Sequence, residues 1–286
     1  MTNPLVIRVP GTTTDTAKPI LRKDAMLKTD VNGGVKFLFD LGNLPGYPGG
    51  NPVNGTVIPD LSDHADGVAE VSAGQAVAYL GGGFDYEGVT AINNDIKAPS
   101  SCLASIYAAS NQYFMKVAYR KLPLLADWPS TTSLMSILAD NTATSGYTTV
   151  PDLLTIGLGN APNISARRQT SVGAADTLTM NADANMYGQV CQIAFYRTAA
   201  GQTLRVKSAL GTKTATAAVG SNNSANFSAC EPRWGFIGQS GALTPANSTK
   251  QRSYRGWIED LALSGRDPVT VLDKDFTDTV TRALYS

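Results

Sequence analysis

The feature that most constrains the fold is a series of short β-strand patterns, each bounded by glycine, proline or asparagine. In residues 203–208 two aliphatic side chains, Leu204 and Val206, alternate with basic ones. This period of two predicts a strand with one face on a core and the other in water. A glycine-containing turn joins the segment to residues 189–197, so the pair predicts a β-hairpin. Further strand-like segments are residues 35–40, 75–80, 84–88, 105–106, 113–120, 152–158, 212–219, 234–238 and 256–263.

The C-terminal end carries the clearest helical pattern, whereas residues 132–139 fit either a helix or a strand. Asp267 is a good N-cap, and Pro268 suits the first helical position. Apolar residues then recur at spacings of three or four, which predicts a helix over residues 267–284 that packs on the rest of the domain. The members of this stripe are Val269, Leu272, Phe276, Val280 and Leu284.

Many short strands with almost no helix before the C-terminus predict an all-β protein. We expect an antiparallel β-sandwich of the jelly-roll kind, with residues 31–286 as one domain that includes the C-terminal helix. No sequence period of about 20–50 residues recurs, which argues against propellers and solenoids.

Residues 1–30 contain too little apolar sequence to form a core of their own, so we expect an extended N-terminal arm. An equally good interpretation makes its β-prone run the first strand of the sandwich. As an arm, the run would dock on a neighbouring subunit by strand addition. The residues expected to make this contact are Leu5, Val6, Ile7, Arg8 and Val9.

Residues 41–60 are rich in glycine, proline and asparagine, which rules out a helix or a central strand there. Loops of this length inside compact domains are uncommon and often functional. We expect this loop, with Tyr47 in it, to contact neighbouring subunits.

Charge and cysteine content narrow the class of protein. Charged residues make up 16% of the chain, against roughly 25% in soluble domains, and 23 basic residues balance 23 acidic ones. A basic face for nucleic acid is therefore not expected. The first ten residues do not resemble a signal peptide, and no apolar run suits a membrane span. Cys102, Cys191 and Cys230 are expected to be small buried residues, the alternative being a Cys191–Cys230 bridge.

The sequence offers no catalytic constellation, so we expect a protein that is not an enzyme. His64 is the single histidine, and its acidic surroundings in residues 60–66 favour a turn. Glu259 and Asp260 are adjacent on a predicted strand, which places them on opposite faces and excludes a hydrolytic pair.

Two polar segments are weak calcium candidates, although Asx turns are the preferred explanation of both. Their oxygen-bearing residues are Asp60, Asp63, Asp66, Asn181, Asp183 and Asn185. Otherwise no cofactor is expected. Aromatic residues near turns are candidates for stacking on a glycan, although such residues more often belong to a core. They are Tyr86, Trp128, Tyr147 and Trp234.

Residues 254–264, with the phrase Gly-Trp-Ile-Glu-Asp-Leu, resemble the closing strand of laminin-G-like and concanavalin-A-like sandwich domains. Residues 52–62, ahead of a glycine-rich strand, are similar to the opening of such domains. Glu259 occupies a place where an aspartate is common in these families. The abundance of Ala, Thr, Asn, Ser and Gly, together with the arm, resembles virion structural proteins of tailed bacteriophages.

This resemblance implies a structural component of a phage particle, such as a decoration, baseplate or tail-fibre protein, that acts by protein–protein docking. Its partners would be other virion proteins or copies of itself in a homo-oligomer, and it would be located in the virion after assembly in the host cytoplasm. The alternative is a carbohydrate-binding module that recognises a cell-surface glycan, with or without calcium. We expect neither nucleic acid nor a membrane as a partner.

Overall fold

The computed structural model describes residues 24–43, 46–129, 131–139, 151–160, 162–237, 250–280 and 285–286. These residues form two sheets, here sheet A and sheet B. Sheet A contains β1 (Val35–Asp40), β4 (Ala78–Leu80), β5 (Gly83–Asp85), β7 (Phe114–Lys121), β12 (Val190–Thr198), β13 (Gly201–Ser208), β14 (Gly211–Ala217) and β16 (Arg252–Asp260). Sheet B contains β2 (Val57–Ile58), β3 (Gly67–Glu70), β6 (Asn94–Lys97), β8 (Thr131–Leu138), β9 (Asp152–Gly159), β10 (Asn163–Ser171), β11 (Ala174–Asn181) and β15 (Glu231–Phe236).

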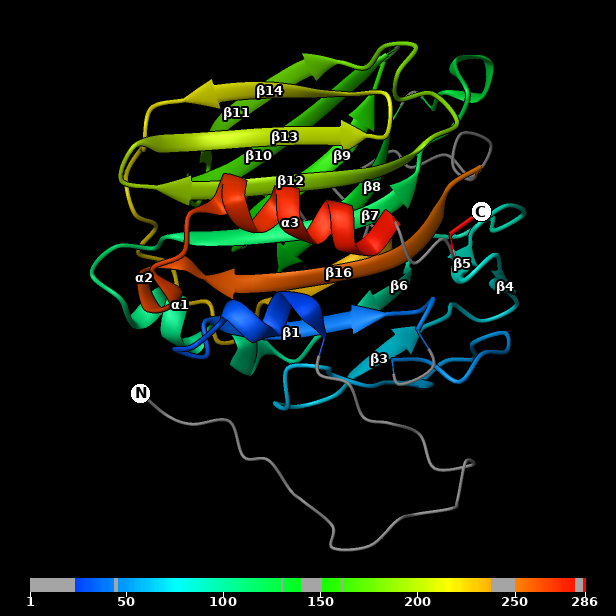
Figure 1. Cartoon of the computed structure of the whole chain (residues 1–286), viewed down its shortest axis with the longest axis horizontal. Coiled ribbons are helices and arrows are strands. Elements are labelled where there is room, and N and C mark those ends of the chain that lie inside the picture. Colours follow the sequence, from blue (N-terminus) through cyan, green and yellow to red (C-terminus); the bar gives the residue numbers. More distant parts are fainter. Residues whose placement is uncertain are drawn as a thin grey trace, which may run out of the picture.

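The two sheets pack face to face as an antiparallel β-sandwich, which confirms the predicted all-β fold (Figure 1). The order in sheet A is β14-β13-β12-β7-β16-β5-β4, with β1 also paired to β16, and in sheet B it is β11-β10-β9-β8-β15-β6-β3-β2. The short helices are η1 (Ala25–Thr29), η2 (Ser100–Leu103), α1 (Ala104–Ala108), η3 (Leu125–Asp127) and α2 (Leu261–Ser264), and the long one is α3 (Pro268–Val280). None of the helices in these residues is long and apolar enough to cross a membrane.

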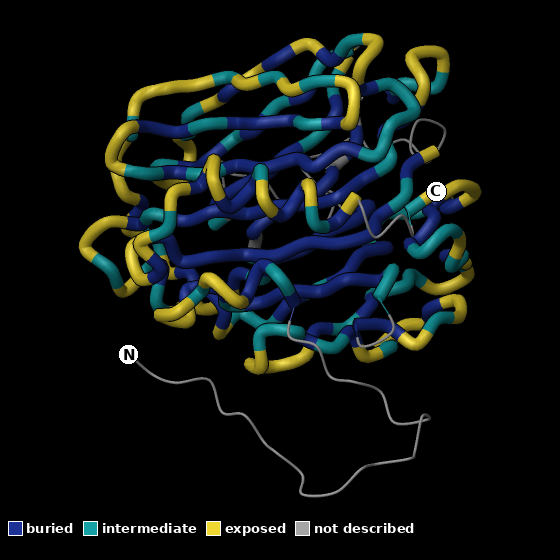
Figure 2. Tube along the Cα trace, in the orientation of Figure 1, coloured by how far each residue is buried: buried dark blue, intermediate teal, exposed yellow. Residues whose placement is uncertain are grey.

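The main core lies between the sheets, and the predicted hairpin shows how the sequence builds it. β12 pairs antiparallel with β13, so that Phe195 lies opposite Leu204 and Ile193 opposite Val206. All four of these side chains are fully buried. Figure 2 shows the same pattern across the molecule, because the central strands are buried along most of their length and exposed residues gather in the outer turns.

A second core lies on the outer face of sheet A, where α3 crosses the strands (Figure 1). The sequence places Arg205 and Lys207 in water, but the structure places them against this helix. Both side chains contact Asp273 of α3 at 2.5 Å. The predicted alternation between two faces of the strand was therefore correct. The expectation that the basic face lies in water was wrong, because α3 packs over it.

The predicted helix forms, but its buried stripe is rotated. Leu272 and Phe276 are buried as expected, whereas Val269 and Val280 are 43% and 38% exposed. Leu284 lies outside the described residues. Val271 and Asp275 are buried in addition. A purely apolar stripe could not reveal that a carboxylate faces the sheet.

Asp275 is buried because Arg255 on β16 lies beneath α3. The Arg255 guanidinium is fully buried and pairs with Asp275 at 2.8 Å, Asp24 at 2.8 Å and Asp40 at 3.0 Å. Through Asp24 this network fixes η1, whose Met26 and Leu27 are buried. The arm predicted over residues 1–30 therefore does not include residues 24–30, because these pack on the sandwich. Residues 1–23, including the run 5–9, lie outside the described part.

The structure resolves one ambiguous secondary-structure prediction and corrects two others. Residues 132–139, which fit either type, fall almost entirely in strand β8. Residues 105–106 were expected to be β-structure but belong to α1, and residues 261–263 extend the chain after β16 as α2. Apolar segments of two or three residues do not distinguish strand from helix without a longer period.

Candidate functional site

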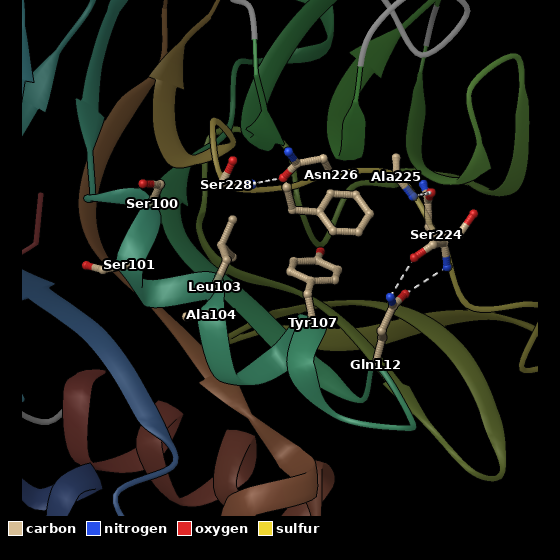
Figure 3. A pocket seen from close by; sticks show the side chains of 12 residues that line it. Ser100, Ser101, Leu103, Ala104, Tyr107, Gln112, Ser224, Ala225, Asn226 and Ser228 are labelled. Atoms are coloured by element: carbon tan, nitrogen blue, oxygen red, sulfur yellow. Dashed lines mark hydrogen bonds between the residues drawn. The ribbon is translucent and has the colours of Figure 1, made fainter.

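A pocket of about 520 Å³ opens at one end of the sandwich, between η2–α1 and the loop that joins β14 to β15 (Figure 3). Its size falls within the roughly 300–1,000 Å³ of small-molecule sites. The lining residues are Ser100, Ser101, Leu103, Ala104, Tyr107, Gln112, Asn223, Ser224, Ala225, Asn226, Phe227 and Ser228. We call this set the end pocket.

An aromatic pair stands at the centre of the end pocket. The rings of Tyr107 and Phe227 lie 3.9 Å apart between centroids, with their planes inclined by 32°. Figure 3 places Tyr107 between Leu103 and Gln112 in the lining. Burial raises the pKa of the Tyr107 hydroxyl well above its ordinary value, so this group stays neutral and protonated. Phe227 is 7% exposed and Tyr107 is half-buried, so the pair presents a small, uncharged and apolar surface to the cavity.

The loop wall of the pocket begins with a segment fixed by a buried arginine of sheet A. Arg197 on β12 donates to the carbonyls of Val219 (2.8 Å), Gly220 (2.9 Å) and Gln112 (3.0 Å) and to the side chain of Asn222 (2.9 Å). Hydrogen bonds from a charged donor to carbonyls are among the stronger ones in proteins. The start of the loop therefore has a defined position against the sandwich.

Two amide side chains join the two walls. The Gln112 side-chain nitrogen donates to the carbonyl of Asn223 at 2.7 Å, and the backbone nitrogen of Asn223 donates back to Gln112 Oε1 at 2.8 Å. Asn223 also donates to Gln169 of β10 at 3.0 Å. Because both side-chain amides are hydrogen-bonded within the protein, they shape the pocket and leave ligand binding to other groups.

The groups left for a ligand are hydroxyls and one amide. Ser101, Ser224, Asn226 and Ser228 are exposed, and Ser100 is half-buried. Asn226 Oδ1 accepts from the Ser228 backbone, and the amide nitrogen of this exposed side chain makes no hydrogen bond with the described residues. None of the residues that line this pocket is charged, a cysteine or a histidine. The chemistry available is stacking and neutral hydrogen bonding.

A contrasting hollow lies on the outer face of sheet B, around Arg233. This guanidinium donates to Glu70 at 2.7 Å, to Glu231 at 2.7 Å and to Asp95 at 3.2 Å. Burial raises the pKa of Asp95 to about 7, although Arg233 beside it acts in the opposite direction. The carboxylates here are already neutralised by an internal partner, which is a structural arrangement.

The predicted glycan contacts fall elsewhere. Trp234 and Tyr86 are 0% and 1% exposed, so neither ring presents an open face to a ligand. Trp128 is half-buried, stands edge-on to Tyr187 and donates to the carbonyl of Gly159 at 3.1 Å. Tyr147 lies outside the described residues.

Tyr47, expected to face neighbouring subunits, is also directed inward. Its ring packs edge-on against Phe84 at 5.2 Å and lies 5.3 Å from Tyr79. Its hydroxyl donates to the carbonyl of Gly50 at 2.8 Å. Its residue exposure is 3%, because the glycine- and proline-rich loop folds back over this aromatic group.

The calcium candidates are engaged by their own loops. Both carboxylate oxygens of Asp60 accept from Ser62 Oγ, and Asp60 Oδ2 also accepts from the His64 backbone at 2.8 Å. Asp66 accepts from the Asp60 backbone, while Asp63 adopts a positive φ of 65° in this turn. In the second group, Asp183 accepts from the Asn185 backbone and pairs with Lys213, which also donates to the Asn181 carbonyl.

The groups considered for catalysis are separated as well. The Glu259 carboxylate is buried and binds Arg266 at 2.6 Å, whereas Asp260 caps α2 through the backbone of Leu263. His64 is half-exposed in its turn. Cys102, Cys191 and Cys230 are buried free thiols.

The end pocket itself was missed by sequence reasoning. One wall was interpreted as β-structure, and the other is a polar segment, residues 222–228, whose single aromatic residue is the only signal. The two aromatic residues are 120 positions apart (227 − 107), and only the folded chain brings them together.

No known protein family profile matches the sequence, and no curated protein matches it. Solved structures do match in fold. The binding domain of botulinum neurotoxin serotype C1 aligns with a TM-score of 0.52 and 10% identity, over 80% of this chain and 49% of that domain. The binding domain of botulinum neurotoxin DC, in complex with rat synaptotagmin II, gives 0.53 and 9% identity, over 87% and 52%.

A third structure is of botulinum neurotoxin type C, which depends on two ganglioside molecules to get into cells. It aligns with a TM-score of 0.52 and 10% identity, over 91% of this chain and 53% of that one. This chain thus spans about half the length of the toxin binding domains it matches. A Trypanosoma rangeli sialidase aligns more loosely, at a TM-score of 0.48. At these identities the likeness defines the class of fold, a β-sandwich shared with binding domains.

Proposed function

We propose that this protein is a non-enzymatic, glycan-binding β-sandwich module and that the end pocket is its binding site. The observation that carries the proposal is the composition of that pocket. A close, tilted pair of aromatic rings, Tyr107 and Phe227, is surrounded by serine and asparagine side chains with hydrogen-bonding capacity left for a ligand.

Sugars need this combination. Their C–H faces are apolar and pack on aromatic rings, while their hydroxyls require neutral donors and acceptors at fixed places. The buried arginine behind the loop supports the same function, because a preformed site loses less free energy on ordering when a ligand binds. The neurotoxin type C that depends on gangliosides shares the fold, and this analogy makes glycans the ligands to test first.

The direct test is a glycan array with the whole chain, in the presence and absence of calcium. Tyr107→Ala should remove the signal, because it deletes half of the aromatic pair. Tyr187→Ala is the matched control, since Tyr187 is also half-buried and also contacts one aromatic ring, Trp128, but does not line the end pocket. An array without hits in both conditions would refute the proposal.

A role in a phage particle remains a second proposal, supported by the sequence resemblance and by the balanced charge. This second proposal concerns the particle to which the module is attached. A glycan-binding module at a phage tail tip would satisfy both proposals. Light scattering on the whole chain and on a chain without residues 1–23 tests it. A defined oligomer that becomes monomeric on truncation supports docking through the arm, whereas equal masses argue against it.

A further inference from the structure

We propose, resting on the glycan-binding function above, that the end pocket selects uncharged sugars that carry an N-acetyl group. Two properties of the lining lead to this choice. One is the complete lack of charged side chains among the lining residues, and the other is an apolar wall that extends beyond the aromatic pair.

The end pocket has no charged side chain in its lining, and this disfavours the binding of acidic sugars. A carboxylate that leaves water needs a cationic partner or several strong donors, and otherwise its desolvation opposes binding. The nearest arginine described above, Arg197, already binds the carbonyls of Val219 and Gly220 and the side chain of Asn222. Other hollows of the described surface differ, since one contains Arg233, Lys97 and Glu70. The end pocket is therefore suited to a neutral ligand.

The apolar wall favours an acetamido group. A plain hexose needs one ring to stack on, and Tyr107 with Phe227 already supplies it. Leu103, Ala104 and Ala225 line the same cavity. Leu103 is already buried in the core, whereas the methyl groups of the exposed Ala104 and the half-buried Ala225 would remain uncovered. An acetamido methyl has the size and polarity to cover them.

The acetamido group also brings one carbonyl and one N–H. The Asn226 amide nitrogen can donate to the carbonyl, and the exposed hydroxyl of Ser224 or Ser228 can accept from the N–H. A hexose without this substituent would leave the apolar wall uncovered and these polar groups without their hydrogen bonds to the ligand. The substituent thus pairs with apolar and polar features that the lining presents together.

The test compares matched sugars by NMR titration or calorimetry with the whole chain. N-acetylglucosamine is compared with glucose, N-acetylgalactosamine with galactose, and 3′-sialyllactose with lactose. We expect the acetylated member of one hexosamine pair to bind about ten-fold more tightly, from one buried methyl and one added hydrogen bond. Sialylation should give no gain in affinity.

A charge-insertion variant tests the location. Ala104→Glu should abolish binding, because it places a carboxylate on the wall of the pocket. Ala108→Glu introduces the same group on the same helix, at an exposed residue that does not line the pocket, and should bind like the unmodified protein. Both residues are exposed, so thermal unfolding should be nearly unchanged in both variants.

The outcomes separate the two proposals. Equal affinities within both hexosamine pairs would overturn the N-acetyl inference and leave glycan binding standing. Tighter binding of the sialylated sugar would overturn the preference for uncharged sugars, because sialic acid carries a carboxylate beside its own acetamido group. Loss of binding in both glutamate variants, or in neither, would overturn the assignment to the end pocket. Failure of every sugar, on the array as well, would overturn glycan binding and this inference together.

Discussion

The Nζ atom of Lys116 lies 3.1 Å from the centre of the Trp234 ring and joins the two sheets in the middle of the core. Lys116 is 0% exposed, and its amine has no hydrogen-bond partner among the described residues. Burial lowers the pKa of this lysine well below its ordinary value, although Cys102 and Asp95 raise it in part. A cation over the face of a tryptophan is attracted to it, but here the cost of leaving water dominates.

Replacing this lysine should stabilise the protein. Lys116→Met removes the amine, which has no hydrogen-bond partner, and shortens the unbranched side chain by one atom, so we expect the free energy of unfolding to rise by about 1–3 kcal/mol. In the unmodified protein the unfolded state binds the extra proton, so the penalty is largest below the folded pKa and disappears as the pH approaches about 10.4. Urea unfolding at pH 7 and pH 9.5 should show the advantage of the variant shrinking. An advantage that does not depend on pH would contradict the neutral-lysine account.

Asp95 predicts the opposite direction of pH dependence. Its folded pKa of about 7 lies above the roughly 3.9 of an unfolded aspartate, so the folded state binds more protons between these values. The stability that Asp95 contributes is therefore present near pH 4 and lost as the pH rises through 7. The difference in unfolding free energy between the unmodified protein and Asp95→Asn should fall over this window and then level off. A constant difference would show that Asp95 titrates normally.

Removing the Arg255 guanidinium should be severe. Arg255→Met would leave the carboxylates of Asp24, Asp40 and Asp275 buried without their shared cation, and the loss should be about 3–5 kcal/mol. Hydrogen exchange should rise first in η1, which the network holds. Lys274→Met is the control, since it removes a solvent-exposed pair with Asp278 and should change stability little. Equal effects of the two substitutions would contradict this ranking.

Arg197 does not line the end pocket but holds the loop that does, so replacing it tests whether the position of that loop matters for binding. Arg197→Met deletes four hydrogen bonds to the start of the loop and to Gln112, so hydrogen exchange over residues 219–228 should increase and sugar affinity should drop by about ten-fold. Arg205→Met is the control, because Arg205 is similarly buried but lies under α3, on the outer face of sheet A. Faster exchange with unchanged affinity would mean that the loop does not form the site.

The sequence predicted the sandwich because its strands carry local signals. The alternation around Leu204 and Val206, and the glycines at 81 and 82 with φ of 54° and 76° between β4 and β5, depend on a few adjacent residues. The features that the sequence did not predict depend on contacts between residues that are far apart along the chain. The helical pattern assigns Asp275 to a polar face, and only the folded chain places Arg255 beneath it. Likewise, no local pattern distinguishes the buried Lys116 from a surface lysine within a strand.

The candidate site shows the same limit. Aromatic residues were singled out by their type and their nearness to turns, but Trp234, Tyr86 and Tyr47 are buried in the core. Tyr107 and Phe227 lie in short segments without periodicity, and their pairing is set by α1 and the β14–β15 loop meeting at one end of the sandwich. No pattern along the chain encodes that meeting.

The most direct measurement is a ¹H–¹⁵N NMR titration of the whole chain with N-acetylglucosamine and, separately, with N-acetylgalactosamine. A glycan site in the end pocket predicts that at least one sugar shifts amide signals of residues 100–107 and 223–228, with little change elsewhere. Millimolar additions of both sugars that shift no signals, or shifts that gather around Arg233 on the outer face of sheet B, would contradict it.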